Sequence, residues 1–310
     1  MISIIMPVYN GEKTIENSIK SVLNQSNSDW ELLIVDNGSQ DNTLRIVLEY
    51  EKQDDRIKIF SCTEPGVVYA RAMGLRYAKG NYIAFLDADD QFKSEALDEI
   101  QNIIQSGNYD IISFGYDIVS ECGNVEQCKP KLSGEITDME LFEGLFQVGT
   151  LGFLWNKVYR TDIIRRVQAP YGMEVCEDLY MNCYMLMERR DIYVLQENLY
   201  LYFANTESVT RTMKKKITES GDWKYYLAYT QIEKMCQQDV KKKRCIQSAK
   251  LVVLKLGAEE LLGESGFYNA KKKMIKNMIK NIPKVWISKN SLRFKFGYLK
   301  TLVLGVLGGK

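Results

Sequence analysis

The chain has 310 residues, of which 45% are hydrophobic, and this is enough to bury a full core in one large domain with an appendage. It contains no histidine, which excludes Ser-His-Asp and Cys-His catalysis and histidine-ligated zinc and leaves carboxylates for acid–base or metal chemistry. The formal net charge is only +1, and the seven cysteines form no Cys-x-x-Cys pair, so we expect reduced cytosolic thiols.

The first ninety residues alternate short apolar runs with amphipathic segments. We expect strands at 2–8, 31–35, 56–61 and 82–86, and helices at 13–25, at 67–78 and from Ser94. Strands that alternate with helices of roughly ten to fifteen residues predict a mostly parallel, doubly wound α/β sheet flanked by helices. We expect no signal peptide, because Met1 leads into a strand without a basic leader, and no run approaches the roughly 20 apolar residues that cross a bilayer.

Three carboxylates, Asp87, Asp89 and Asp90, follow the strand at 82–86 within four positions. Burying them unpaired is costly, so they must emerge at the C-terminal edge of the sheet, where open α/β sheets bind ligands. Two aspartates spaced i, i+2 can share a hard divalent cation with the phosphate oxygens of a nucleotide. Taken alone, the cluster favours a solvated acidic turn that caps the helix from Ser94; the other motifs change that balance.

Four motifs occur in a fixed order, and together they are more specific than any one of them. They are Ser3-Ile-Ile-Met-Pro-Val-Tyr-Asn, Val35-Asp-Asn-Gly-Ser, Ala70-Arg-Ala-Met-Gly-Leu and Leu86-Asp-Ala-Asp-Asp. In this order and spacing they resemble the family-2 glycosyltransferases, which are inverting enzymes with the nucleotide-sugar-binding GT-A fold. The resemblance is close over the first ninety residues and looser to about residue 211.

The resemblance implies a pocket for the nucleoside at the ends of the first two strands. Asp36 would accept a hydrogen bond from the nucleobase, and Pro7, Val8 and Tyr9 would flank the base. Glu12 matches a polar position near the nucleotide. From the residues alone, Asp36 is also a plausible cap of the next helix, and Glu12 an ordinary acid of a first helical turn.

The resemblance also implies a site for the diphosphate and a metal ion. The guanidinium of Arg71 would contact the diphosphate in bidentate fashion. Asp89 matches the metal-binding carboxylate and Asp87 its partner at the ribose or a metal-bound water, with Ala88 between them. The cofactor would be Mn²⁺ or Mg²⁺, acting as a Lewis acid. Asp90 is expected to be a loop or helix-capping residue.

Two positions depart from the family pattern. Asn37 replaces the second aspartate of the usual Asp-Asp-Gly-Ser motif, and Ala72 replaces the asparagine of Ala-Arg-Asn. They are the only support for the alternative reading, a non-catalytic, membrane-docked subunit that has kept a nucleotide-sugar pocket. The presence of Asp89 and Asp178 favours an enzyme.

The acceptor side is marked by Trp155-Asn-Lys-Val-Tyr-Arg and Glu177-Asp-Leu-Tyr-Met, which resemble the subgroup that builds bacterial surface polysaccharides. The resemblance makes Asp178 the catalytic base and Glu177 a neighbour that positions the base or the acceptor. Two adjacent carboxylates at a helix N-terminus are stabilised as anions, and only one can face the reacting hydroxyl. Lys157 and Arg160 are candidates for cations that line the acceptor side, with a surface role as the alternative.

The chain beyond Arg211 becomes helical, with helices expected at 223–235, 244–262 and 268–279. We expect a GT-A domain over 1–213, with a nucleotide-sugar half at about 1–110 and an acceptor half at about 111–213. A helical region follows over 214–310, and Lys214-Lys-Lys marks the boundary. Tyr200-Leu-Tyr-Phe resembles the family's closing strand, and Ser208-Val-Thr-Arg resembles a loop that covers the donor.

Charge is strongly segregated along the chain. Residues 271–310 hold eleven Lys or Arg and no acid, which leaves 30 basic and 40 acidic side chains in residues 1–270. Aromatic and aliphatic residues lie among the bases from Trp286 onward. This combination favours an amphipathic segment, residues 285–310, that lies on an anionic membrane surface. A helical tail packed on its own domain is the alternative, and we expect no binding of nucleic acid.

The expected activity is that of an inverting, metal-dependent glycosyltransferase that moves one sugar from a nucleoside-diphosphate sugar to a hydroxyl of a glycan acceptor. The family favours a UDP-sugar as the donor and an acceptor linked to a polyprenyl diphosphate. The expected location is cytoplasmic and peripheral, on the inner face of the cell membrane. A Rossmann dehydrogenase is excluded because no Gly-x-Gly-x-x-Gly follows the first strand.

Overall fold

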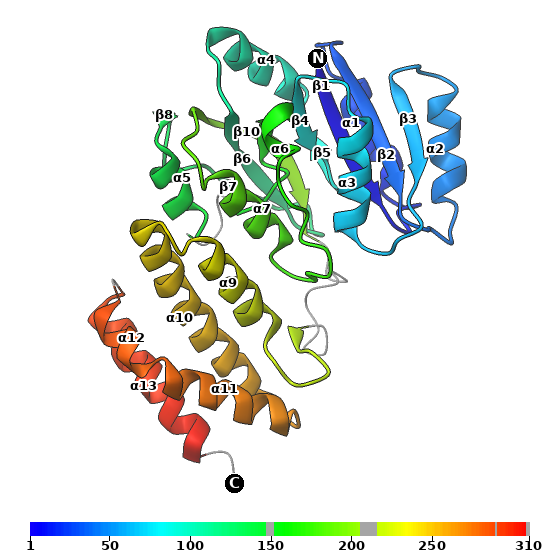
Figure 1. The fold of residues 1–310 in the computed structure, drawn as a ribbon. Helices are drawn as coiled ribbons and strands as arrows, with labels where there is room; N and C mark the ends of the chain where they lie inside the picture. The colour runs from blue at the N-terminus through cyan, green and yellow to red at the C-terminus, as the bar shows by residue number, and fades with distance from the viewer. Residues whose placement is uncertain (147–151, 205–215, 289, 308–310) are drawn as a thin grey trace. The chain divides into compact units, whose positions relative to one another are not determined.

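The computed structural model describes residues 1–146, 152–204, 216–288 and 290–307, which form two compact units (Figure 1). The first unit comprises Met1–Gly172 and Met181–Thr206, and the second comprises Met173–Tyr180 and Glu207–Lys310. The boundary predicted at Lys214 and the covering loop predicted at Ser208-Val-Thr-Arg lie outside the described residues.

The N-terminal half of the first unit is a parallel sheet. Its strands lie in the order β3 (Ile57–Ser61), β2 (Trp30–Asp36), β1 (Ile2–Val8) and β4 (Tyr82–Phe85). Strand β1 pairs in parallel with both β2 and β4, and β2 pairs in parallel with β3. Every residue of β1, β2 and β4 is buried, as expected for parallel strands covered on both faces. The predicted α/β class is confirmed.

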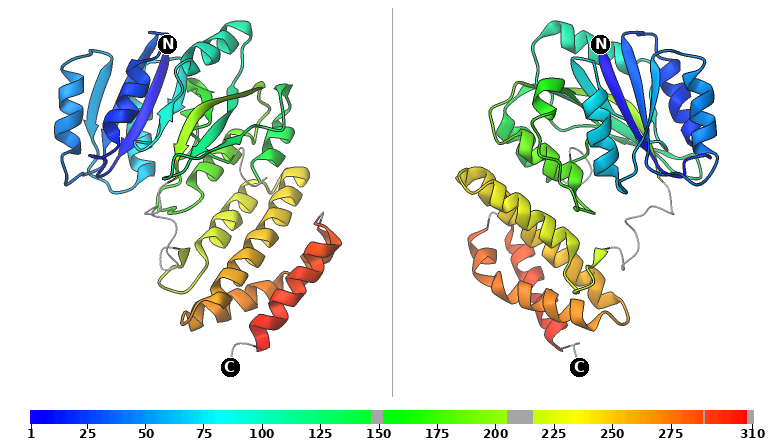
Figure 2. Two further views of the ribbon diagram at one scale, coloured as in Figure 1. Left: turned by 180° about the vertical axis from the view of Figure 1, so that it is seen from behind. Right: turned by 45° about the vertical axis from the view of Figure 1, so that its right-hand side comes forward.

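Helices cover both faces of this sheet (Figures 1 and 2). They are α1 (Ile15–Leu23), α2 (Thr43–Glu51), α3 (Val67–Tyr77) and the short α6 (Thr161–Ile164), while α4 (Ala96–Ser106) packs on β10 (Ile192–Phe203) of the other half. Helix α3 approaches β1 closely at Gly74, where an added Cβ would lie 2.4 Å from Cγ2 of Ile5. This close packing fixes the N-terminal half of α3 beside the C-terminal end of β1.

The other half of the sheet is mixed in direction. It contains β9 (Lys157–Arg160), β6 (Ile111–Val119), β10 (Ile192–Phe203) and β5 (Gln91–Phe92), with β7 (Val125–Cys128) and β8 (Gly134–Ile136) at its margins. Strand β9 runs antiparallel to both β4 and β6, and β10 runs parallel to β6 and antiparallel to β5. Helix α5 (Asp138–Gly144) belongs to this region, and α7 (Glu177–Met185) begins in the second unit and ends in the first.

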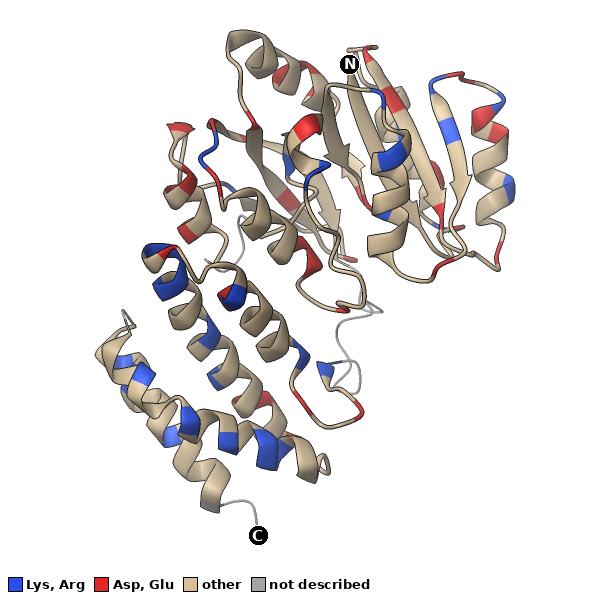
Figure 3. Cartoon of the chain, viewed as in Figure 1, with Lys and Arg blue, Asp and Glu red and all other residues tan. Residues whose placement is uncertain are grey.

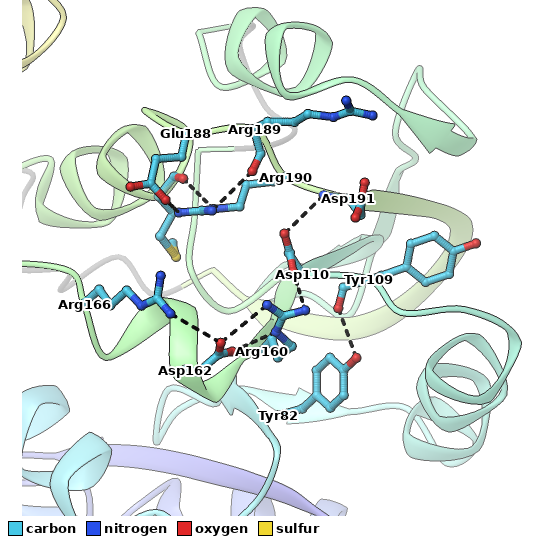
Figure 4. Close-up of polar contacts among 11 residues, drawn as sticks. Tyr82, Tyr109, Asp110, Arg160, Asp162, Arg166, Glu188, Arg189, Arg190 and Asp191 are labelled. Atoms are coloured by element: carbon cyan, nitrogen blue, oxygen red, sulfur yellow. Dashed lines mark hydrogen bonds and ion pairs between the residues drawn. The ribbon is translucent and has the colours of Figure 1, made fainter.

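A polar network joins these strands at the edge where β4 begins (Figure 4). Arg160 Nη1 lies 2.8 Å from Asp110 Oδ1, and its Nε lies 2.7 Å from Asp162 Oδ1. Asp110 also accepts a hydrogen bond from the backbone N–H of Asp191 at 3.2 Å. Because β9 is antiparallel to β4, Arg160 pairs with Tyr82, at the end of β4 remote from the aspartate cluster. This position and these ion pairs match the surface role considered for Arg160 and lend no support to the acceptor-side role.

The second unit is helical. It contains α9 (Lys224–Met235), α10 (Val240–Gly263), α11 (Tyr268–Lys280), α12 (Ile282–Ile287) and α13 (Leu292–Leu307). Helix α10 begins four residues before the predicted start, because the Asp239 carboxylate caps it by accepting from the N–H groups of Lys241 and Lys242. No helix in the described ranges is both long enough and apolar enough to cross a membrane. All seven cysteines are free thiols.

Candidate functional site

The loops that follow β1 and β2 are fastened to each other at the C-terminal edge of the sheet. The backbone N–H of Asn37 donates to the carbonyl of Val8 at 2.8 Å. Glu12 Oε2 accepts from both the backbone N–H (3.0 Å) and the side-chain amide (2.8 Å) of Asn42. Glu12, which the resemblance places near the nucleotide, therefore also holds the second loop against the first.

The residues expected around the nucleobase share this edge. Val8 and Asp36 are register partners in adjacent parallel strands, and Pro7 lies one position earlier. Asp36 is buried, and its Oδ1 accepts from the backbone N–H of Ser39 at 3.3 Å. Tyr9 directly follows β1 and is 64% exposed. The structure thus brings the four predicted positions together and leaves an exposed aromatic ring beside a buried carboxylate.

Asn37 has a structural role that its sequence position did not suggest. Its Nδ2 donates to the carbonyls of Cys62 (3.3 Å) and Glu64 (2.6 Å), and its Oδ1 accepts from the N–H of Gly66 at 2.7 Å. Gly66 has φ = +123° and precedes α3, so the amide ties the 62–66 turn to the end of β2. An aspartate cannot donate to two carbonyls. The departure from the family pattern therefore matches the local contacts.

Helix α3 places Arg71 against the aspartate cluster. Arg71 is buried, and its Nη2 lies 3.4 Å from Oδ1 of Asp87. The side chain of Asp87 keeps 31% of its surface exposed. The two residues predicted at the diphosphate and the ribose thus meet at the end of β4. The guanidinium of Arg71 has five N–H donors, so it can bind a second anion while it contacts Asp87.

The aspartate loop is anchored by Tyr200, which sequence reasoning did not single out. The Tyr200 hydroxyl accepts from the N–H of Asp87 at 3.1 Å and donates to Oδ2 of Asp90 at 2.9 Å. Asp90 Oδ1 accepts from the N–H of Phe203 at 2.8 Å. Asp90 is buried, and burial together with the charges of Asp87 and Asp89 raises the pKa of its carboxyl. Asp90 is therefore a loop anchor rather than a helix cap.

Asp87 and Asp89 fit the requirements of a hard divalent cation. Carboxylate oxygens are the ligands that Mg²⁺ and Mn²⁺ prefer. Burial raises the pKa of the Asp89 carboxyl, and a cation beside it would restore the charged form. Between them, the carbonyl of Ala88 accepts from the hydroxyl of Ser18 at 2.9 Å. No group of three or more His, Cys, Asp or Glu among the described residues could hold a metal ion. Phosphate oxygens and water would have to complete the coordination.

A cavity of about 340 Å³ lies beside Arg71, between α3 and the segment after α6. Ala72 lines it at the position where the family often carries asparagine, together with Arg165 and Tyr171. Arg165 is held by the carbonyls of Leu75 and Ala78. This cavity was not predictable from the sequence, because its walls come from segments about ninety residues apart.

Lys157 is fully buried, contrary to both roles considered for it. Its Nζ donates to the carbonyl of Phe153 at 2.6 Å and to Asn156 Oδ1 at 2.8 Å. Trp155 stacks on Phe153 and Tyr200, with ring centroids 4.6 and 4.5 Å apart. Lys157 therefore stabilises the chain around Trp155 and neither lines a pocket nor lies on the surface.

Glu177 and Asp178 form the first turn of α7, as predicted, and both are partly buried. They follow Cys176, which has φ = +61°; burial, with the charges of both carboxylates, raises the pKa of its thiol to about 12. They belong to the Met173–Tyr180 segment of the second unit, where Glu174 pairs with Lys224 at 2.5 Å. Their approach to the reacting hydroxyl stays a prediction.

Comparison with known proteins bears on this site. The uncharacterized glycosyltransferase EpsJ of Bacillus subtilis (strain 168) is 29% identical over 235 residues, covering 74% of this chain and 68% of EpsJ. The putative glycosyltransferase EpsH of the same organism is 31% identical over 232 residues, covering 71% and 65%. The Escherichia coli UDP-Glc:alpha-D-GlcNAc-diphosphoundecaprenol beta-1,3-glucosyltransferase WfgD is 41% identical over 121 residues, covering 39% and 47%. The chain spans between about half and about two thirds of these relatives.

Solved structures share the fold. Residues 1–349 of S. aureus TarS in complex with UDP-GlcNAc superpose with a TM-score of 0.73 at 18% identity, over 99% of this chain and 90% of TarS 1–349. Residues 3–162 match the family described as Glycosyl transferase family 2, which is more than half of the chain. The chain therefore belongs to glycosyltransferase family 2 and is a glycosyltransferase with the GT-A fold.

Proposed function

We propose that this enzyme transfers one sugar, with inversion, from a UDP-sugar to a hydroxyl of a glycan acceptor linked to a polyprenyl diphosphate. The observation that carries the proposal is the shared sheet edge at which Asp36, Arg71 and the Asp87–Asp90 loop meet. The name of WfgD supports a UDP-sugar and a diphosphoundecaprenol-linked acceptor, and TarS structures contain UDP or UDP-GlcNAc. The product would belong to bacterial surface polysaccharide synthesis.

The donor would be held by residues of the first unit. Asp36 would bind the nucleobase between Pro7, Val8 and the exposed ring of Tyr9. Arg71 would contact the diphosphate while it keeps Asp87 in place. Asp87 and Asp89 would hold Mn²⁺ or Mg²⁺. When bound, this ion would neutralise negative charge on the departing diphosphate.

Asp178 would act as the general base. Its carboxylate would take the proton from the acceptor hydroxyl while that oxygen bonds to the anomeric carbon. The bond from the anomeric carbon to the phosphate oxygen would break at the same time, and the nucleoside diphosphate would leave with the electron pair. Glu177 would position the base or the acceptor, since adjacent side chains at a helix N-terminus point in different directions.

A lipid-linked acceptor implies that the enzyme works at a membrane surface. Residues 285–310 would provide this contact on the cytoplasmic, inner face of the cell membrane, because they carry cations and no acid. Nucleic acid is not a proposed partner.

The test is Asp178→Asn beside a Glu177→Gln control. Each variant is assayed for transfer to a lipid-linked glycan and for stabilisation by UDP-sugars. Asp178→Asn is expected to lose transfer by at least about 10²-fold with donor stabilisation unchanged, and Glu177→Gln is expected to lose less. Full transfer by Asp178→Asn would move the base elsewhere. Inertness of the wild type with every donor and acceptor would favour the non-catalytic alternative.

A further inference from the structure

Helix α13 has an inner face that is fixed to its own unit. Tyr298 is fully buried, and its hydroxyl donates to the carbonyl of Met278 at 3.0 Å. Thr301 donates to Glu259 Oε1 at 3.0 Å, and Leu302 belongs to the same core as Val285. From Val285 to Leu302, the described residues are therefore anchored to the helical unit. The packing expected as the alternative accounts for this inner face.

The opposite face of α13 is apolar and exposed. It comprises Leu292 (66% exposed), Phe296 (63%), Val303 (54%) and Val306 (55%), at a helical spacing of 4, 7 and 3 residues. Trp286 (48%) and Ile287 (83%), from the end of α12, extend it, and the Trp286 ring lies 6.3 Å from the ring of Phe296. We call these six residues the outer face. Exposed apolar side chains that gather on one face of a helix mark a binding surface.

Basic side chains border the outer face. Arg293 and Lys300 are exposed on α13, and Lys295 Nζ donates to the carbonyl of Trp286 at 2.9 Å. Helices α11, α12 and α13 carry Lys and Arg and no acidic residue (Figure 3). Two copies that met through this face would set cations against cations, which opposes self-association. An anionic partner with an apolar layer beneath its charges matches both features.

We propose that the outer face inserts into the headgroup region of an anionic bilayer, with Arg293, Lys295 and Lys300 on lipid phosphates. This deepens the proposed function and rests on its membrane-linked acceptor. The insertion would be shallow, because the inner face of α13 stays packed in the helical unit. Six named residues, and not the whole of 285–310, would then carry the apolar part of membrane binding.

The first test uses sedimentation with phosphatidylcholine vesicles, with and without phosphatidylglycerol. Leu292→Ser/Phe296→Ser is expected to lower the partition coefficient at least about tenfold. The control is Leu256→Ser, which removes an exposed leucine (54%) from α10, outside the outer face. Arg293→Gln and Lys300→Gln are each expected to lower the partition coefficient about fivefold on anionic vesicles, and high salt should mimic them.

The second test uses tryptophan emission. Of the four tryptophans, Trp30, Trp155 and Trp223 are buried, and only Trp286 is substantially exposed. A blue shift on anionic vesicles that is absent in Trp286→Phe would locate this residue in lipid. Equal partitioning of the wild type and Leu292→Ser/Phe296→Ser would overturn the proposal. The proposal would also be overturned if the wild type bound no vesicles and formed a dimer that the Leu292→Ser/Phe296→Ser substitutions dissociate.

Donor stabilisation by UDP-sugars separates the two proposals, because it reports on the first unit. If the protein binds vesicles but no UDP-sugar stabilises it, the membrane role of the outer face stands and the proposed function is refuted. If the double serine variant unfolds, the Arg293→Gln and Lys300→Gln variants, which lie on the exposed surface, decide the question. Unchanged anionic-vesicle binding by both would overturn it.

Discussion

Replacing Asn37 by aspartate, the residue usual in the family, is expected to destabilise the first unit. The new carboxylate would still accept from Gly66, but it would face the carbonyls of Cys62 and Glu64, which Nδ2 now contacts at 3.3 and 2.6 Å. Each lost hydrogen bond is worth about 1 kcal/mol. Because the contacts are partly exposed, the total loss should be about 1–3 kcal/mol, or about 2–4 °C of melting temperature per kcal/mol.

The assay is urea unfolding at neutral pH, with hydrogen exchange of a peptide that covers residues 62–67. Asn37→Ala is the control, because it removes both donated hydrogen bonds, and also the one accepted from Gly66, without adding a charge. We expect the aspartate variant to be at most as stable as the alanine variant and to exchange faster than wild type in this peptide. An aspartate variant with wild-type stability and protection would refute the role assigned to the amide.

Two further predictions concern buried polar groups. Tyr200→Phe removes the hydroxyl that bridges Asp87 N–H and Asp90, so it should cost about 1–3 kcal/mol of unfolding free energy, measured by urea titration. Burial raises the pKa of Glu233, but hydrogen bonds from Lys250, at 2.8 Å, and Gln247 outweigh burial and hold that pKa below its ordinary value. Glu233→Gln should therefore cost about 3 kcal/mol at pH 7, and the difference from wild type should shrink as pH falls below about 4.5. A pH-independent difference would contradict this.

The grouping of the predicted donor residues at one edge of the sheet was predictable, because parallel strands place their C-terminal ends together. Asp36, Arg71 and Asp87 each lie in a short motif at a strand end or helix start, so order along the chain was sufficient to bring them together. Tyr200 was not predictable as an anchor, since it lies more than a hundred residues from the loop that it holds. Its place in an apolar strand predicted only that its side chain would be buried.

Strand direction explains what the sequence did not reveal about Lys157 and Arg160. Nothing in Lys157–Arg160 reveals that β9 runs antiparallel to β4, and this direction sends Arg160 to the far edge and buries Lys157. The membership of Met173–Tyr180 in the helical unit is equally invisible in a sequence, because it depends on long-range contacts. In α13, by contrast, the expected packing on its own unit holds for the inner face. Membrane binding by the outer face stays a proposal.

The most direct measurement is a thermal-shift panel of UDP-, GDP- and dTDP-sugars, with and without Mn²⁺, on the wild type and Asp89→Ala. We predict that UDP-sugars stabilise the wild type in a metal-dependent manner, by about 2.7 kcal/mol at one hundred times the dissociation constant. The effect should disappear in Asp89→Ala. No response to any nucleotide, or an equal response in the variant, would contradict a donor site built on the aspartate loop.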